Sequence, residues 1–213
     1  MRRLAVSVEG RTEEEFVKRV LGGHLRERRV EPTPILLGRG RSGSRGGNVS
    51  SDRLVSEMLK LLGSFDIVTS LVDYYGFRDK GDRSVAELEE HLQGKLRKRV
   101  GRRWDERKAI PYVQRHEFEG LLFSDVRAFA DQPGFPDTCV DELQAVRGRF
   151  TTPEDINDDP ETAPSKRLGR VLPRYDKVLH GPALAATIGL GTIRVECPRF
   201  DAWVARLESL ETV

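Results

Sequence analysis

Residues 66–76, DIVTSLVDYYG, decide the fold class of this chain. After the leading aspartate, residues 67–72 are mostly apolar or β-branched, which is typical of a strand that lies in the centre of a sheet and is buried on both faces. Asp73 stands where this strand should end, and two tyrosines and a glycine follow it. The stretch therefore predicts a central strand with a carboxylate at its carboxyl end.

Three more strands are expected around this one. Their apolar residues lie at 4–8, 33–37 and 109–113. Pro111 has no amide N–H to give to a neighbouring strand, so the last of them should lie at an edge of the sheet.

Amphipathic helices are expected between these strands. Thr12 and Glu15 have the spacing of a capping box, which predicts a helix start at that point. A second helix should cover residues 54–62, and Ser84 with Glu87 forms another capping box before a third helix. The alternation of strands and helices predicts an α/β fold, with a mainly parallel four-stranded sheet and helices on both faces.

The pattern becomes helical after about residue 117. Apolar residues recur at helical spacing in five segments: 117–130, 138–147, 165–172, 182–188 and 199–210. Pro182 is expected to open one helix and Gly189 to end it, and Trp203 should lie in the core. We expect a single domain over residues 1–213, with a core at about 1–130 and a helical part at about 131–213 packed on the same core.

The composition limits the class of protein. Of the 213 residues, 38% are hydrophobic, and 36 basic residues balance 34 acidic ones to leave a net charge of +2. This balance argues against disorder caused by one-sided charge. No apolar run approaches the roughly 18 residues of a membrane span, and no signal peptide is evident. Cys139 and Cys197 are far apart in sequence, so we expect reduced thiols in a cytoplasmic protein.

Acidic residues follow several of the expected strands. Glu9 follows the first and Asp73 the third, while Glu117 and Glu119 follow the fourth. Ligands of open α/β sheets bind outside the carboxyl ends of the strands, and Mg²⁺ prefers a few carboxylates together with water. The pattern indicates a metal site, although each acid alone also fits a solvated loop. His116 beside Glu117 fits either a base or ligand or a structural histidine.

Two basic segments fit contacts with a phosphate backbone, although both also fit solvated surface. The first is the Gly-, Arg- and Ser-rich loop 38–49, and the second is the basic run 95–108. The predicted nucleic-acid contacts are Arg39, Arg41 and Arg45 in the loop, and Arg99, Arg102 and Arg103 in the run. The loop also matches G-x-G-x-x-G, but the next helix starts too late to hold a pyrophosphate on its N-terminus.

Six motifs carry a family resemblance. They are VEGRTE (8–13), VDYYG (72–76), QRHEFEGLLFSD (114–125), PEDIND (153–158), ETAPSKR (161–167) and CPRFDAW (197–203). Together they resemble the bacterial Toprim-like family labelled domain of unknown function 4276. The first motif resembles the opening of Toprim domains, the catalytic fold of primases, type II topoisomerases and OLD-family nucleases.

The resemblance implies roles for particular residues. Glu9 matches the Toprim glutamate, implied to be a metal ligand or a general acid/base, and Asp73 matches the first aspartate of the Toprim pair, implied to hold Mg²⁺. Tyr75 stands where the second aspartate is expected, which departs from a standard two-metal site. Either Glu117 or Glu119 is a candidate to replace the lost ligand.

Lys166 resembles the lysine that OLD-type nucleases place near their metals. The resemblance thus implies a Mg²⁺- or Mn²⁺-dependent phosphodiesterase, a nuclease acting on nucleic acid, encoded with an ABC-type ATPase partner in bacterial defence loci. Two alternatives remain open at this point. One is a catalytically inactive binding or regulatory subunit that docks on an ATPase, and the other is a small-nucleotide phosphotransferase.

Overall fold

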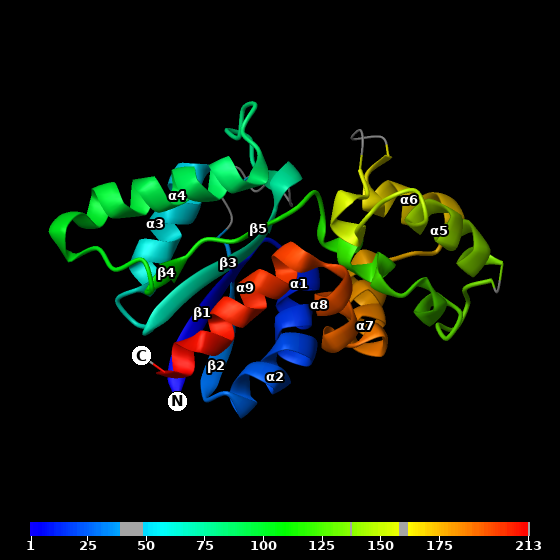
Figure 1. The fold of residues 1–213 in the computed structure, drawn as a ribbon, viewed down its shortest axis with the longest axis horizontal. Helices are drawn as coiled ribbons and strands as arrows, with labels where there is room; N and C mark the ends of the chain where they lie inside the picture. Colours follow the sequence, from blue (N-terminus) through cyan, green and yellow to red (C-terminus); the bar gives the residue numbers. More distant parts are fainter. Residues whose placement is uncertain (39–48, 137, 158–161, 213) are drawn as a thin grey trace.

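The computed structural model describes residues 1–38, 49–136, 138–157 and 162–212. Its centre is a parallel sheet in the order β2-β1-β3-β4, with β5 also paired to β3 (Figure 1). The strands are β1 (Arg2–Val8), β2 (Val30–Leu36), β3 (Ile67–Asp73), β4 (Ala109–Ile110) and β5 (Val113–Gln114). The predicted α/β fold with a parallel four-stranded order is therefore confirmed.

The expected strand at 109–113 is interrupted and forms the short strands β4 and β5. Hydroxyl groups of β3 make the bonds across the gap. Thr69 Oγ1 donates to the Ile110 carbonyl at 2.6 Å. Ser70 Oγ accepts the Tyr112 N–H at 3.0 Å and donates to the Tyr112 carbonyl at 2.9 Å. Pro111 lies in this gap at the sheet edge, as its missing N–H predicts.

Helices cover both faces of the sheet (Figure 1). The helices α3 (Ser51–Leu61) and α4 (Val85–Val100) pack on the face that carries Ala5, Val68 and Val72. The capping box at the start of α4 is confirmed, because Glu87 Oε2 accepts the Ser84 N–H at 2.7 Å and Ser84 Oγ accepts the Glu87 N–H at 3.3 Å.

The first helical stretch begins earlier than its predicted cap. It consists of α1 (Arg11–Phe16), a π-helical turn η1 (Val17–Leu21) and α2 (Gly22–Glu27). The capping box of Thr12 and Glu15 is wrong. Glu13 Oε2 accepts the Gly10 N–H at 2.9 Å instead. Thr12 is buried inside the first turn, and Glu15 pairs with side chains one turn further along the helix.

The C-terminal part is helical, as predicted. Its elements are η4 (Phe118–Ser124), η5 (Val126–Phe129), α5 (Cys139–Arg147), η6 (Pro153–Asp155), α6 (Pro164–Val171), α7 (Lys177–Ile188), α8 (Leu190–Glu196), α9 (Pro198–Glu208) and η8 (Ser209–Thr212), after the short turns η2 (Tyr74–Gly76) and η3 (Gly101–Arg103). Gly189, with φ of 83°, ends α7 as expected. Pro182 lies inside α7 rather than at its start, because Asp176 caps the helix one and a half turns earlier. The short helix α8 was not predicted.

One hydrophobic cluster joins the N-terminal and C-terminal parts. It contains Leu4, Val6 and Val8 of β1 together with Phe200 and Trp203 of α9. The predicted burial of Trp203 is confirmed, since the residue is 4% exposed. The indole stacks on Tyr112 with ring centres 4.6 Å apart and donates to Thr69 Oγ1 at 2.9 Å. Helix α9 is therefore fixed against the β3–β4 edge.

Two sequence expectations concern membranes and thiols. Within the described residues, no single helix is long and apolar enough to cross a membrane; only the pair α7 and α8, bent by 86°, passes on combined length and composition. Cys139 and Cys197 are both free and buried. Burial raises the pKa of the Cys197 thiol to about 12, so this thiol is uncharged and unreactive near neutral pH.

Candidate metal site

A cleft of about 370 Å³ opens at the carboxyl ends of β1 and β3. Three of the predicted acids line it: Glu9 after β1, Asp73 at the end of β3, and Glu117 before η4. Parallel strands bring their carboxyl ends to one edge of the sheet. Glu9 and Asp73, which are 64 positions apart in sequence, and Asp73 and Glu117, which are 44 positions apart, therefore line the same cleft. Glu13 and Lys177 also line this cleft.

Glu9 is held closely against the turn that follows β3. A Cβ atom added to Gly76 would overlap Glu9 Oε2 and lie 3.1 Å from Glu9 Cδ. A larger residue at position 76 would therefore push the Glu9 carboxylate out of its place. This contact explains the glycine in the VDYYG motif by the space that Glu9 needs.

Asp73 and Glu117 each hold the start of the next segment. Asp73 Oδ1 accepts the Phe118 N–H at 2.9 Å, and Glu117 Oε2 accepts the Ser165 N–H at 2.9 Å. These bonds fix η4 and α6 beside the cleft and orient both carboxylates. Each carboxylate keeps a second oxygen, Asp73 Oδ2 and Glu117 Oε1, that can serve as a ligand.

The structure separates the other two predicted residues from the cleft lining. Glu119 is completely buried, and its Oε1 lies 3.4 Å from Lys177 Nζ. Lys166 is exposed on α6 and does not line the cleft. The lysine beside the acids is Lys177, in the first turn of α7. The prediction starts this helix at Pro182. Recognition of Asp176 as the N-cap would have placed Lys177 in the first turn of the helix, but not beside the acids.

The acids around the cleft are close enough to disfavour full ionisation. Burial, followed by repulsion from Glu119 and Glu9, raises the pKa of Glu13 to about 7. Burial also raises the pKa of Asp73 well above its ordinary value, with further repulsion from Glu13, Glu9 and Glu119. Without a compensating cation, the cluster therefore retains protons at a pH where isolated carboxyl groups have lost them.

Lys177 is the cation that the chain itself supplies to this cluster. Its side chain is 52% exposed. Burial lowers the pKa of Lys177, but attraction by Glu119, Asp73, Glu117 and Glu13 outweighs burial and raises it. Lys177 therefore carries a positive charge next to the acids at neutral pH.

Tyr75 lines the cleft at the position where the resemblance implies a second aspartate. Its ring stacks on His116, with ring centres 5.6 Å apart and an angle of 28° between the planes. The Asn157 amide donates to the Tyr75 hydroxyl. His116 adopts a left-handed backbone conformation with φ of 63°, which is uncommon for a residue with a side chain. His116 thus supports Tyr75 and does not line the cleft itself.

The predicted basic contacts do not join the described cleft. Arg39, Arg41 and Arg45 lie outside the described residues. Arg99 bridges two helices, since it donates to Ser56 Oγ at 2.7 Å and to Asp52 Oδ1 at 2.9 Å.

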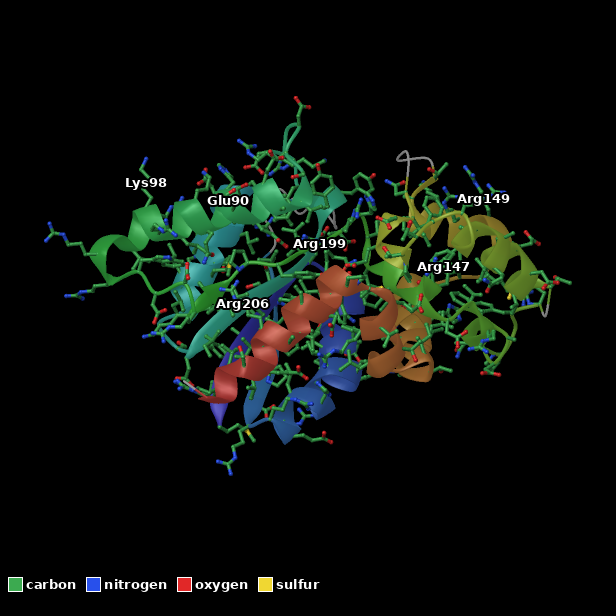
Figure 2. All side chains as sticks on the ribbon, in the orientation of Figure 1. Glu90, Lys98, Arg147, Arg149, Arg199 and Arg206 are labelled. Carbon is green, nitrogen blue, oxygen red and sulfur yellow. The ribbon has the colours of Figure 1, made fainter. Side chains whose placement is uncertain are left out.

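The basic run 95–108 lies toward the amino ends of the strands, whereas the cleft lies at their carboxyl ends. Helix α4 starts near the cleft, where the Tyr74 hydroxyl donates to the Arg83 carbonyl. It then runs back along the sheet, and the run ends where the Lys108 carbonyl accepts the Val68 N–H near the start of β3. Figure 2 shows Lys98 at that far end of α4. The 16 residues of α4 span roughly 24 Å, so Arg102 and Arg103 lie far from the acids.

Comparison with known proteins places the chain in a family. The family described as Domain of unknown function (DUF4276) matches residues 8–208. The chain belongs to this family. The solved C-terminal region of the Xanthomonas campestris pv. campestris OLD protein is similar, with 14% identity and a TM-score of 0.46 over 98% of this chain and 95% of that chain. No curated protein matches the chain.

For this DUF4276 member, the Toprim resemblance implies a divalent metal, and the donor set fits one in its chemistry. Glu9, Asp73 and Glu117 offer the hard oxygen ligands that Mg²⁺ and Mn²⁺ take. Burial, followed by repulsion from Glu13, Glu9 and Glu119, raises the pKa of Asp73, and a bound cation would lower it again. Among the described residues, no group of three or more His, Cys, Asp or Glu side chains is already assembled for an ion. Mutual repulsion is a physical reason for the carboxylates to stay apart until a cation joins them.

Proposed function

We propose that this protein is a Mg²⁺- or Mn²⁺-dependent phosphodiesterase, a nuclease that acts on nucleic acid. One observation supports this function above all. Glu9, Asp73 and Glu117 come from three separate segments and line one cleft at the carboxyl ends of parallel strands. Lys177, whose pKa is raised by the acids, lies in the same cleft.

Each residue has a role in this proposal. Glu9, Asp73 and Glu117 would hold the ion, which supplies an activated water and polarises a phosphoryl oxygen when it is bound. Lys177 replaces Lys166 as the lysine that stabilises negative charge developing on the phosphate. Glu119 would position Lys177 through their 3.4 Å contact.

The arginines of the loop 38–49 remain the proposed contacts to the phosphate backbone near the cleft. The described residues on either side of this loop support that proposal. The Leu37 N–H donates to the Val8 carbonyl at 2.9 Å, and the Val49 N–H donates to the Gly76 carbonyl at 3.1 Å. The described residues that flank the loop, Leu37 and Val49, thus contact the ends of β1 and of the turn after β3. Replacing all three with alanine should weaken nucleic-acid binding without changing metal binding.

Arg99, Arg102 and Arg103 remain proposed contacts to a more distant part of the substrate. Roughly 24 Å of helix corresponds to about 7 base pairs of duplex at 3.4 Å per pair. If a duplex extended along α4, each lost phosphate contact would flatten the salt dependence of binding by about 0.9 log units. The triple alanine variant of these residues therefore measures whether the duplex reaches this edge.

The resemblance also implies an ABC-type ATPase partner, which we include in the proposal.

A second candidate function follows from Tyr75. Tyrosine replaces an implied metal ligand, and the described residues hold no assembled metal group. The tyrosine at this position favours a catalytically inactive binding or regulatory subunit that docks on such an ATPase.

A cleavage assay separates the two candidates. Single-stranded and duplex DNA and RNA are incubated with the protein and Mg²⁺ or Mn²⁺, with and without an ABC-type ATPase of the proposed kind. The nuclease proposal predicts metal-dependent cleavage that falls at least about 100-fold in Asp73→Asn and Lys177→Met. Asp66→Asn, at the other end of β3, should cleave normally. Absence of cleavage under all these conditions favours the docking subunit.

A further inference from the structure

A second hollow, of about 820 Å³, lies beside the candidate metal site. Helix α1, the turn η1, the end of β2 and the first turn of α7 form its walls. Arg11 and Val178 line both this groove and the metal cleft, so the two hollows adjoin each other. We call it the α1–α7 groove.

Apolar side chains are exposed in the α1–α7 groove to an unusual degree. Leu36 is 43% exposed, Val178 is 44% exposed and Leu179 is 67% exposed. Elsewhere in the described residues, the large hydrophobic side chains exposed to this extent are only Met1 and Val195. Scattered exposed apolar residues need no explanation, but a group of them in one concave surface indicates a contact site.

The charged residues on α1 and the adjoining turn η1 form a sequence that can pair with a second copy of itself in the opposite direction. The sequence from 14 to 19 is Glu-Glu-Phe-Val-Lys-Arg. If two copies of this helix lie antiparallel, Glu14 of one faces Arg19 of the other, and Glu15 faces Lys18. All four charged side chains line the groove. Within one chain, Lys18 and Arg19 already pair with these acids at 2.6–3.2 Å on the surface, where such pairs contribute little and can be exchanged.

We infer that the α1–α7 groove is the contact between two copies of this chain, with the α1–η1 stretch antiparallel to its counterpart and Leu36, Val178 and Leu179 covered. A two-fold axis requires a self-complementary surface, and the order of charges along α1 and η1 meets that requirement. Nucleic acid fits this surface less well, because its acids equal its bases in number: Arg11, Lys18 and Arg19 against Glu14, Glu15 and Asp176.

The neighbouring sheet edge does not offer an alternative way to pair. The outer edge of β2 carries Pro32 and Pro34, in register with Leu4 and Val6 of β1. Both prolines lack the N–H that an added strand would need. The pairing is thus by helix and side chains rather than by extension of the sheet, and it does not depend on the proposed nuclease activity.

Sedimentation velocity over a series of protein concentrations tests the inference. The mass should double from 24.1 kDa as the concentration rises. Leu179→Asp should raise the dissociation constant of the pair by about tenfold or more. Val195→Asp is the matched control, since Val195 is 80% exposed but does not line the groove, and it should leave the association unchanged.

A charge exchange gives a second, independent readout. The variants Lys18→Glu/Arg19→Glu and Glu14→Lys/Glu15→Lys should each sediment as monomers, while their mixture should form a one-to-one pair. Circular dichroism melts check that each variant is folded. A wild-type protein that stays monomeric at every concentration would overturn the inference. So would a dimer that Leu179→Asp and the charge variants leave intact, or a groove variant that alters nucleic-acid binding without altering mass.

Discussion

Asp73 lines the cleft and also accepts the Phe118 N–H at 2.9 Å, so its charge and its hydrogen bond act on stability in opposite directions. Burial and nearby acids raise its pKa, which means that the ionised form is disfavoured in the folded protein. Asp73→Asn removes the charge and keeps an acceptor oxygen. We expect it to make the metal-free protein more stable at neutral pH, because the amide does not carry the buried charge that the fold disfavours.

Asp73→Ala removes the acceptor as well. It leaves the Phe118 N–H without its partner, so it should be less stable than Asp73→Asn by about 1–3 kcal/mol. Urea unfolding of both variants in EDTA measures the difference. If Asn and Ala prove equally stable, the bond to Phe118 does not hold η4.

The Glu9 carboxylate fills the space over Gly76. Gly76→Ala should displace that carboxylate and weaken Mn²⁺ binding by about tenfold, while the fold survives because a side-chain end can move. Isothermal calorimetry measures the affinity. Gly94→Ala is the control, since a Cβ at position 94 meets nothing within 4 Å. In mid-helix it should stabilise the protein by about 0.5–1 kcal/mol and leave Mn²⁺ binding unchanged.

At the scale of elements, the sequence predicts most of the sheet because its signals are local. The apolar run of β3 and the Ser84–Glu87 box of α4 are confirmed. The predicted starts of α1 and α7 are both wrong. At α1 the N-cap is Gly10, which has no side chain that could signal a cap. At α7 the N-cap is Asp176, six residues before Pro182, where the sequence predicts the start.

The wrong start of α7 also affects the predicted site, because Lys177 lies in the first turn of this helix. Glu9, Asp73 and Glu117 were found because they follow strands, whose carboxyl ends share one edge. Lys177 and Glu13 were missed because they belong to helix starts, and contact with the acids depends on tertiary packing that no spacing in the sequence encodes. Lys166 was chosen from a resemblance and is exposed away from the cleft lining.

The cap of α7 leads to a prediction of its own. Asp176 Oδ1 accepts the Val178 N–H at 2.9 Å and the Leu179 N–H at 2.8 Å, which fixes the turn that carries Lys177. Asp176→Ala should cost about 1 kcal/mol of stability and also lower phosphodiester cleavage. Ser84→Ala removes a cap from α4 at a similar cost but should leave cleavage unchanged. Equal cleavage rates for Asp176→Ala and Ser84→Ala would show that the position of Lys177 does not affect the cleavage reaction.

At the scale of the whole molecule, the acidic cluster makes stability depend on pH. The pKa of Glu13 is about 7 in the folded protein, above its ordinary value of 4.5. The folded state therefore binds this proton more tightly than the unfolded state, and the resulting stability is present below pH 4.5 and lost as the pH rises to about 7. The loss amounts to at most about 3 kcal/mol.

Denaturant unfolding in EDTA between pH 4.5 and 7.5 measures this slope. Glu13→Gln keeps an acceptor for the Gly10 N–H and should flatten the slope, and so should saturating Mg²⁺. A stability that instead rises through this range would show that the cluster does not retain protons in the folded state.

Calorimetric titration of the metal-free protein with Mn²⁺ tests the central claim most directly, because it requires neither a substrate nor a partner. We predict a saturable site that Asp73→Asn abolishes and that Asp66→Asn, at the other end of β3, leaves unchanged. Absence of specific Mn²⁺ binding, or equal binding by wild type and Asp73→Asn, would contradict a metal site formed by Glu9, Asp73 and Glu117.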